Sequence, residues 1–342
     1  MAFFYGHLFA AEPEIRAMFP VSMQAQQRRF YRALTADASR DYLESLGRAH
    51  RKYGVHAGHY PAMRAALLAT CRRSGLGAAG EAAALAAFDR AAAIMAEAAE
   101  ADALLAPAWW TAEVTGHELA APDVAIVTLR PSPALAWVPG QHVAVTCPRW
   151  PRQWRRYSIA NAPRADGTIS LHVRAVPGGL VSPALVHHTR PGDTLVLGPA
   201  EGAMTVDAGS RRDVLCLAGG TGLAPLLAIT EAVTAAAGPR AAGPARREVV
   251  VYHGARTADG LYGLPALRAL AARYPGLKVI AATSADRVPH AVHAAIPDIA
   301  RRALLRDRDI YVSGPDAMII ATVRALLDAG ADPRQLRYDL PG

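Results

Sequence analysis

Cysteine is scarce in this chain of 342 residues, and its three cysteines, Cys71, Cys147 and Cys216, lie far apart in the sequence. Such spacing provides neither a disulfide framework nor a zinc site. Three thiols also cannot supply the four ligands of a plant-type iron–sulfur cluster. A fused ferredoxin of that kind is therefore excluded.

The chain also lacks a long apolar run of the kind that spans a membrane, because Glu81, Asp89 and Arg90 interrupt its alanine-rich stretch. The apolar residues 1–16 carry no basic leader and pass directly into a helical pattern, so we expect no signal peptide. These features predict a cytoplasmic protein with no membrane partner.

Aromatic residues interleaved with basic ones, which would indicate a nucleic-acid surface, are missing as well. The net charge is +8, but the arginines are scattered along the chain. We therefore expect no nucleic-acid partner, no obligate protein partner, and a surface with some preference for phosphorylated cofactors.

Three patterns divide the chain into three predicted domains. Residues 1–106 place apolar residues at helical spacing. Residues 107–207 alternate with a period of two between Pro-Gly turns, which is typical of a small antiparallel β-barrel. Residues 208–342 alternate apolar strands with helical segments, which predicts a doubly wound parallel sheet. The predicted fold class is thus multidomain: an all-α domain, an antiparallel barrel and an α/β domain.

The strands expected in the barrel are 123–129, 142–146 and 169–174. Those expected in the parallel sheet are uniformly apolar, as strands buried on both faces should be, and cover 214–217, 248–252, 278–282 and 309–312.

The first chemical string is Arg155-Arg156-Tyr157-Ser158. A guanidinium suits a pyrophosphate, a tyrosine ring can stack on a flat heterocycle, and a serine hydroxyl can bond a ring nitrogen. The alternative is that Tyr157 is a core residue of the barrel.

A second string, Gly178-Gly179 with Ser182, follows a predicted strand. Its backbone amides and hydroxyl can approach phosphate oxygens at a helix start. Upstream, the Pro139-Gly140 turn precedes Gln141 and His142 and indicates that a strand begins at that point.

A third string, Gly219-Gly220-Thr221-Gly222 with Pro225, follows strand 214–217 and opens a helix. Glycines let the backbone approach a pyrophosphate, and the helix N-terminus favours its charge. The alternative is a glycine-rich turn used for close packing. A fourth string after strand 309–312 fits the edge of a nicotinamide pocket, and its residues are Ser313, Gly314 and Pro315.

In this order the strings resemble the ferredoxin–NADP reductase superfamily over about residues 111–340. The resemblance implies FAD bound by the first two strings and NAD(P)H bound by the last two, with hydride transfer to the flavin. Arg256, Ser284 or Arg287 could meet the 2′-phosphate of NADPH, or could be solvated surface residues. We expect both nicotinamide nucleotides to be accepted.

The helical region contains His50, Tyr60, Tyr5, Gln26 and Phe19. A lone histidine on an alanine-rich helix is most often a surface residue or one with its hydrogen bonds satisfied, and the aromatic residues suit the core of any helical bundle. Together, however, these positions resemble the globin domain of the flavohaemoglobins, a family in which that domain is fused to a reductase of this type.

The resemblance implies a haem b iron bound by the imidazole of His50. It implies that Tyr5 donates a hydrogen bond on the distal side, with Gln26 nearby and Phe19 against the porphyrin. Tyr60 would bond the proximal histidine and raise its basicity.

The glutamate that completes this proximal network is left open. Glu100 is the candidate, but our register puts Ala99 at its position. Because Met1 stands four residues before Tyr5, the first globin helix is expected to be missing. Leu340 stands where many relatives have an aromatic residue near the flavin.

The resemblance implies an NAD(P)H- and FAD-dependent nitric oxide dioxygenase, with O₂ and nitric oxide as substrates. Two alternatives stay open. One is a reductase without haem that passes electrons to a separate acceptor, and the other is a haem protein that binds O₂ or nitric oxide.

Overall fold

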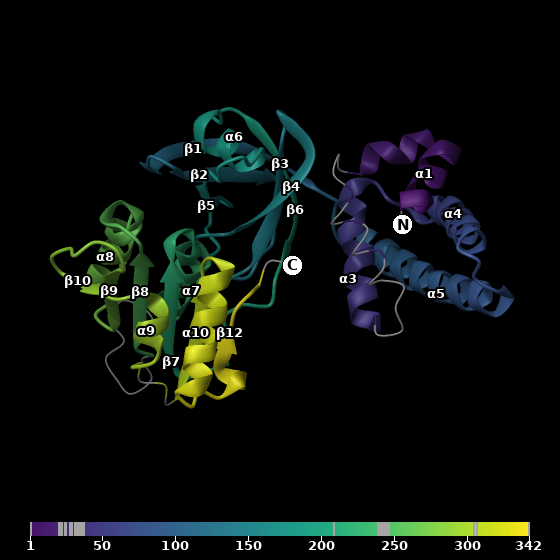
Figure 1. Ribbon diagram of the computed structural model, residues 1–342. Coiled ribbons are helices and arrows are strands. Elements are labelled where there is room, and N and C mark those ends of the chain that lie inside the picture. Colours follow the sequence, from purple (N-terminus) through teal and green to yellow (C-terminus); the bar gives the residue numbers. More distant parts are fainter. Residues whose placement is uncertain are drawn as a thin grey trace. The chain divides into compact units, whose positions relative to one another are not determined.

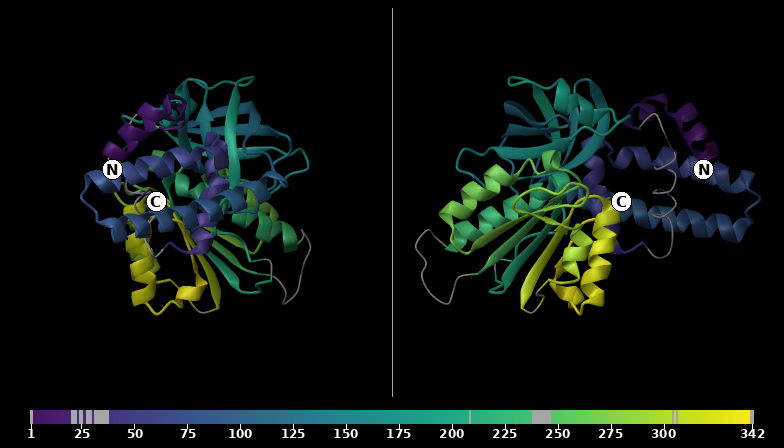
Figure 2. Two further views of the ribbon diagram at one scale, coloured as in Figure 1. Left: turned by 90° about the vertical axis from the view of Figure 1, so that its right-hand side faces the viewer. Right: turned by 60° about the vertical axis from the view of Figure 1, so that its left-hand side comes forward.

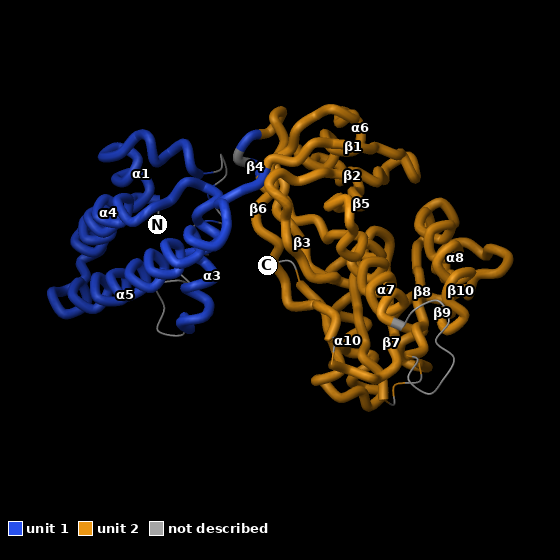
Figure 3. The backbone as a smooth tube through the Cα atoms, turned by 180° about the vertical axis from the view of Figure 1, so that it is seen from behind, with its two compact units in different colours: residues 1–110, 151–153 blue, residues 111–150, 154–342 orange. Residues whose placement is uncertain are grey.

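The computed structural model describes residues 2–19, 23, 26, 30, 38–207, 209–237, 247–303, 305 and 307–340. It divides into two compact units (Figure 3). One contains residues 1–110 and 151–153, and the other contains residues 111–150 and 154–342. None of the helices in the described part of the chain is long and apolar enough to cross a lipid bilayer.

The first unit is helical. Its α-helices are α1 (Ala2–Ala11), α3 (Arg40–His50), α4 (Tyr60–Arg73) and α5 (Ala78–Ala103). Short 3₁₀ turns lie between them, namely η1 (Pro13–Met18), η2 (Arg51–Tyr53) and η3 (Ala57–His59). A proline starts η1, and Gly75 after α4 has a φ of 69°, so both residues break the helical run.

Helix α3 begins where the Ser39 hydroxyl accepts a hydrogen bond from the backbone N–H of Tyr42 at 3.2 Å. It packs closely against α5, because Gly47 has no side chain to strike the backbone of Met95. Leu43, Ala91 and Met95 form the buried core between these two helices. The end of α3, which carries His50, is therefore fixed against the longest helix of the unit.

The second unit contains two six-stranded sheets (Figure 1). The antiparallel sheet has the order β4-β3-β6-β1-β2-β5. Its strands are β1 (Trp110–Ala121), β2 (Val124–Ser132), β3 (His142–Cys147), β4 (Trp150–Ser158), β5 (Ile169–Arg174) and β6 (Thr194–Glu201). A bridge between Ile159 and Leu171 joins its two edge strands and closes the sheet into a barrel. Helix α6 (Val181–His187) lies between β5 and β6 in the sequence.

The parallel sheet has the order β10-β9-β8-β7-β11-β12. Its strands are β7 (Asp213–Gly219), β8 (Val249–Ala255), β9 (Leu277–Thr283), β10 (Ala291–His293), β11 (Arg308–Ser313) and β12 (Leu336–Arg337). Its helical segments are η4 (Gly220–Gly222), α7 (Leu223–Ala237), η5 (Ala258–Gly260), α8 (Leu264–Arg273), α9 (Ile296–Ala300), α10 (Asp316–Asp328) and η6 (Pro333–Gln335).

Alternate residues of β7 pack on opposite faces of the parallel sheet. Val214 and Cys216 belong to the core that contains residues of α7 and α8. Leu215 and Leu217 belong to the core that contains residues of α9 and α10. Helices thus cover both faces, as Figure 2 shows. Successive strands run outward from β7 in one direction and resume at β11 in the other, so the topological switch point lies between β7 and β11.

The predicted fold class is confirmed: a helical region, an antiparallel sheet and a doubly wound parallel sheet. The predicted strands are all present, within a few residues of their expected ends. Strands β1, β4, β6, β10 and β12 were not predicted, whereas α6 begins at the second string, where a helix start was expected. The domain boundaries at residues 106 and 207 stay a prediction.

Candidate functional site

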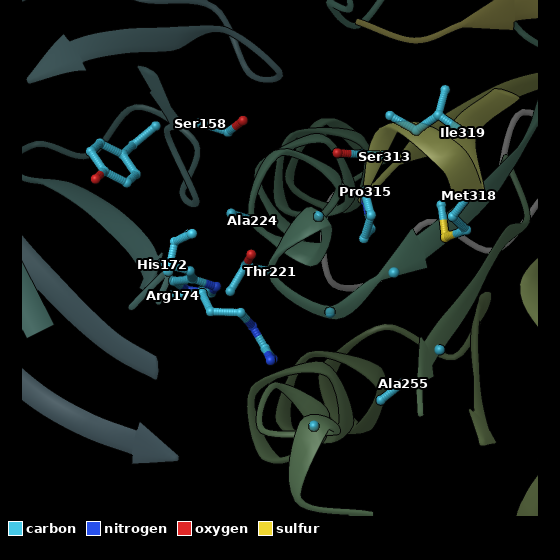
Figure 4. A pocket seen from close by; sticks show the side chains of 18 of the residues that line it. Ser158, His172, Arg174, Thr221, Ala224, Ala255, Ser313, Pro315, Met318 and Ile319 are labelled. Carbon is cyan, nitrogen blue, oxygen red and sulfur yellow. The ribbon is translucent and has the colours of Figure 1, made fainter. Parts of the chain in front are cut away.

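A cavity of about 990 Å³ lies in the second unit (Figure 4). Its walls come from strands β3, β4 and β5 of the antiparallel sheet and from the loops after β7, β8 and β11 of the parallel sheet. These loops lie beyond the carboxyl ends of parallel strands, and two of them flank the switch point, where ligands bind in such sheets.

The cavity brings together nearly all of the residues predicted to bind nucleotides. They are His142, Arg155, Arg156, Tyr157, Ser158, Gly178, Gly179, Ser182, Gly219, Gly220, Thr221, Gly222, Ser313, Gly314 and Pro315. Pro225 is the exception, because it is buried in the first turn of α7 and does not line the cavity. Its fixed backbone suits that helix start instead.

The first two strings meet at Tyr157. Burial raises the pKa of Tyr157, and a hydrogen bond with the Ser182 side chain partly offsets this shift. The Ser182 hydroxyl also accepts a hydrogen bond from the backbone N–H of Val176 at 3.1 Å. The phenol is therefore protonated at neutral pH and tied to the second string, while Arg155 and Arg156 are exposed beside it.

The second string uses part of its own hydrogen-bonding capacity to shape its turn. The Gly179 N–H donates to the Val176 carbonyl at 2.9 Å. Gly178 has a φ of 73°, which a residue without Cβ adopts at no steric cost. The Gly179 amide and one lone pair of Ser182 are thus already engaged, which narrows the set of groups free for a phosphate.

The third string opens η4 at the end of β7. Gly220 has a φ of 54°. A side chain on Gly222 would run into the Ser313 carbonyl, and one on Gly219 would run into the Met318 sulfur. Glycine therefore allows the turn after β7 and the loop after β11 to touch at the switch point. This contact joins the third and fourth strings into one wall.

Two cavity residues on β5, His172 and Arg174, were missed by the sequence analysis. Arg174 donates from Nη1 to the Asp123 carboxylate at 3.0 Å, and its Nη2 lies 3.8 Å from the position of a Cβ on Gly220. Strand β5 contacts η4, and Figure 4 shows both side chains on the same side of the cavity as Thr221. The sequence contained this signal, because β5 alternates apolar and polar residues, and His172 and Arg174 lie with Ser170 on its polar face.

The last described residues also reach the cavity, where Asp339 and Leu340 form part of its wall. Burial raises the pKa of the Asp339 carboxyl, and the charge of Arg156 opposes that shift. Of the three residues considered for the 2′-phosphate of NADPH, Arg256 and Ser284 line the cavity, whereas Arg287 does not.

In the helical unit, the ring of His50 is oriented by its own helix. His50 Nδ1 lies 2.5 Å from the Leu46 carbonyl oxygen, which accepts a hydrogen bond from the protonated nitrogen. Burial lowers the pKa of His50, so the ring is neutral at pH 7. A neutral imidazole with a protonated Nδ1 presents the Nε2 lone pair, which is the donor a metal requires.

Tyr5 occupies a buried cluster of aromatic rings in α1 and η1. Its ring meets Phe19 edge to face at 5.5 Å. Its hydroxyl is buried and makes no hydrogen bond of good geometry within the described residues. Burial raises the pKa of Tyr5 to about 12, and the nearby Gln26 side chain moderates that shift. The structure thus brings together Tyr5, Gln26 and Phe19, as predicted.

The predicted proximal network has no hydrogen bonds among the residues described. Tyr60 begins α4. It packs against the cluster that contains Leu67 of α4 and against the core between α3 and α5. The centroid of its ring lies 6.4 Å from that of Phe88. Glu100 is exposed on α5, whereas Ala99 is half-buried. A shift of one residue rotates a helical side chain by about 100°, so this structure does not place the Glu100 carboxylate beside Tyr60.

Two family models match the second unit. The oxidoreductase FAD-binding domain matches residues 111–205, and the oxidoreductase NAD-binding domain matches residues 216–324. The first match covers the antiparallel sheet, and the second covers most of the parallel sheet. Both kinds of domain are therefore present in this chain.

Curated relatives fall into two groups. Reductase component 1 of terephthalate 1,2-dioxygenase from Comamonas sp is 31% identical over 237 residues, with 68% of each chain covered. The flavohemoprotein of Bordetella pertussis is 28% identical over 382 residues, which cover 99% of this chain and 92% of that protein. Relatives of the second kind therefore match the helical region as well.

Solved structures show the same division. A flavohemoglobin from Malassezia yamatoensis with bound FAD and heme has a TM-score of 0.79 at 16% identity, with 99% of this chain and 93% of that chain covered. The ferredoxin reductase in carbazole 1,9a-dioxygenase has a TM-score of 0.61 at 27% identity, covering 69% of this chain and 70% of that chain. At 16% identity the first likeness concerns the fold alone.

Proposed function

Because this chain belongs to the flavohaemoglobin family and carries FAD- and NAD-binding oxidoreductase domains, we propose that it is an NAD(P)H-dependent nitric oxide dioxygenase. In this reaction one nitric oxide, one O₂ and one electron give one nitrate ion. The two electrons of one hydride from NAD(P)H therefore serve two such turnovers.

The observation that carries the proposal is the state of His50. An imidazole that is neutral, half-buried and held through Nδ1 by the Leu46 carbonyl has the chemistry of an axial haem ligand. The buried Tyr5 hydroxyl, which lacks a well-formed hydrogen bond within the described residues, is a second fit to the haem side. Because burial raises the pKa of Tyr5 to about 12, this phenol keeps its proton and can donate a hydrogen bond to a diatomic ligand.

The cavity of the second unit provides the groups for the two nucleotides. Arg155 and Arg156 offer guanidinium donors for the FAD pyrophosphate, and the Tyr157 ring offers a flat surface for the flavin. The turn at Gly219–Gly222 offers backbone N–H groups and a helix start for the NAD(P)H pyrophosphate. When bound, FAD accepts a hydride and releases single electrons, and haem supplies the iron for O₂.

A second candidate is a reductase that passes electrons to a separate acceptor. The observation that favours it is the 31% identity to a dioxygenase reductase component, against 28% to a flavohemoprotein. Both candidates share the nucleotide cavity and differ in whether the helical unit binds haem.

Purified protein distinguishes the two candidates. The proposal expects FAD together with a haem Soret band, and NAD(P)H-dependent consumption of nitric oxide over many turnovers. His50→Ala should remove the Soret band, whereas His7→Ala, which changes an exposed histidine of α1, should keep it. Protein that binds FAD but no haem, even with haem supplied, would support the reductase instead.

A further inference from the structure

Three ring side chains that none of the four strings contains form a cluster, which we call the histidine–tyrosine cluster. Its members are the buried His172 and His253 and the half-buried Tyr262. His172 belongs to β5 of the antiparallel sheet, His253 to β8 of the parallel sheet, and Tyr262 to the segment between η5 and α8. The cluster therefore connects the two sheets that form the nucleotide cavity.

His253 contributes a ring surface to this cluster. It is fully buried, and neither ring nitrogen has a hydrogen-bond partner among the residues described. Its ring stands edge to face with Tyr262, with centroids 5.9 Å apart and planes at 89°. Because burial lowers the pKa of His253 to about 4, the ring is neutral and packs as an aromatic group.

Tyr262 connects this surface to the other sheet. Its hydroxyl lies 2.9 Å from His172 Nδ1, a hydrogen bond between residues 90 positions apart in the sequence. Burial raises the pKa of Tyr262, so the hydroxyl stays protonated. The segment that follows Tyr262 lies close to α7, because a Cβ on the next residue, Gly263, would meet the side chain of Leu223 at the start of that helix.

The hydrogen bond acts on a residue of the cavity wall. His172 lines the cavity, and Arg174 follows it on the same face of β5, beside the turn that begins at Gly220. Leu223 follows directly from that turn. Tyr262 thus precedes a residue that packs on the helix opening at the turn, and its hydroxyl is hydrogen-bonded to the strand that faces the turn. Removing the hydroxyl would free His172 without changing any group of the turn itself.

We propose that Tyr262 is a positioning residue for the nicotinamide nucleotide: it holds His172 of the antiparallel sheet against the nucleotide turn of the parallel sheet. Tyrosine and phenylalanine differ only in the hydroxyl. If the ring of residue 262 served only to pack its apolar surface, phenylalanine would do as well. The inference rests on the proposed use of NAD(P)H at this cavity.

The test compares dissociation constants for NAD⁺ and NADP⁺, measured on the oxidised full-length protein with FAD bound, from the change in flavin absorbance. Tyr262→Phe should raise the dissociation constant about two- to tenfold, as expected for the loss of one hydrogen bond. FAD content should not change. Tyr274→Phe is the matched control, because the Tyr274 hydroxyl donates to the Arg247 carbonyl away from the cavity.

A double-mutant cycle separates positioning from simple packing. Tyr262→Phe should add no further loss to His172→Leu. His172→Asn, which keeps a polar atom near the position of Nδ1, should bind nucleotide more tightly than His172→Leu and also covers the case that Tyr262→Phe does not fold. Unchanged binding in Tyr262→Phe, or additive losses in the cycle, would overturn the inference. Wild-type protein that binds neither nucleotide would instead overturn the proposed function.

Discussion

Arg174 donates a hydrogen bond from Nη1 to the Asp123 carboxylate at 3.0 Å, and this pair fixes a cation of the antiparallel sheet beside Gly220 of the parallel sheet. The guanidinium keeps further N–H donors for a ligand, since Asp123 uses only one of its five. A phosphate at the Gly219–Gly222 turn would thus meet backbone N–H groups from one sheet and a guanidinium from the other.

Replacing Arg174 should weaken nicotinamide nucleotide binding while sparing FAD. We expect Arg174→Ala to raise the KM for NAD(P)H about tenfold or more, because a hydrogen bond to a charged group contributes about 1.5–3 kcal/mol. The KM of Arg174→Lys should lie between those of the wild type and Arg174→Ala, since lysine keeps the charge but loses the planar set of donors. Steady-state reduction of an artificial acceptor measures the change.

Arg130→Ala is the control for Arg174→Ala, because Arg130 forms an exposed ion pair with Glu113 on the same sheet and does not line the cavity. Its KM should stay within twofold of the wild-type value. Equal KM values for Arg174→Ala and the wild type would contradict the role of this cation.

Tyr5→Phe should stabilise the protein without haem. The buried Tyr5 hydroxyl makes no hydrogen bond of good geometry within the described residues. An unsatisfied buried hydroxyl costs about 1–3 kcal/mol, so its removal should raise the free energy of unfolding by about 1 kcal/mol. In haem-loaded protein the same change should speed the dissociation of O₂, because the donor is lost. Calorimetry of the haem-free protein and stopped-flow spectroscopy of the loaded one measure the two effects. A lower transition temperature in the haem-free variant would show that the hydroxyl has a partner.

Acid should destabilise the second unit through His172 and His253. Burial lowers the pKa of each to about 4, below the unfolded value of 6.5, so the unfolded state binds protons first as the pH falls. The stabilisation is complete above pH 6.5 and is lost as the pH falls toward 4. The loss amounts to about 3 kcal/mol for each histidine.

Urea unfolding between pH 7.5 and pH 5 measures this acid loss. Replacing His253 by Leu should reduce the difference in unfolding free energy between the two pH values. His187→Leu is a suitable comparison, because His187 is exposed in the last turn of α6. If the difference in unfolding free energy between pH 7.5 and pH 5 were the same in His253→Leu as in the wild type, the pKa of His253 would not be lowered by folding.

Gly47→Ala should separate α3 from α5. The added methyl group would strike the Met95 backbone, which has no flexible end to move away, and such overpacking costs about 1–3 kcal/mol. Gly6→Ala in α1 has open space and should instead stabilise its helix by about 0.5–1 kcal/mol. Urea unfolding compares the two, and a neutral Gly47→Ala would indicate that the helices can slide.

The sequence predicted the features that depend on local chemistry. The Gly219–Gly222 string identified the turn after β7, because glycine at such a turn has a local steric reason. The apolar strands of the parallel sheet were equally visible, since burial on both faces leaves a continuous signal. Strand β4 was not visible as a strand, because Pro151 and its arginines break the alternation while pairing with β3 still holds it.

Contacts between distant residues could not be predicted in this way. The hydrogen bond from Tyr262 to His172 depends on how two sheets pack, and nothing in either local sequence reports it. The exposure of Glu100 follows from the rotation of α5, which one residue of register decides. Gln26 was reached only through resemblance to a family, since no local signal marks it.

The bridge between Ile159 and Leu171 gives the barrel a seam. It is an isolated bridge outside the continuous strand pairing, supported by the Ala160 N–H, which donates to the Ser170 carbonyl at 2.7 Å. The residues just before the seam, Tyr157 and Ser158, belong to the flavin string, whereas those on β5 beyond it belong to the nicotinamide wall. The buried Asn161 side chain strengthens this seam, because its Oδ1 accepts a hydrogen bond from the Ser170 N–H at 2.6 Å. The few bonds of the seam therefore join the two walls of the cavity.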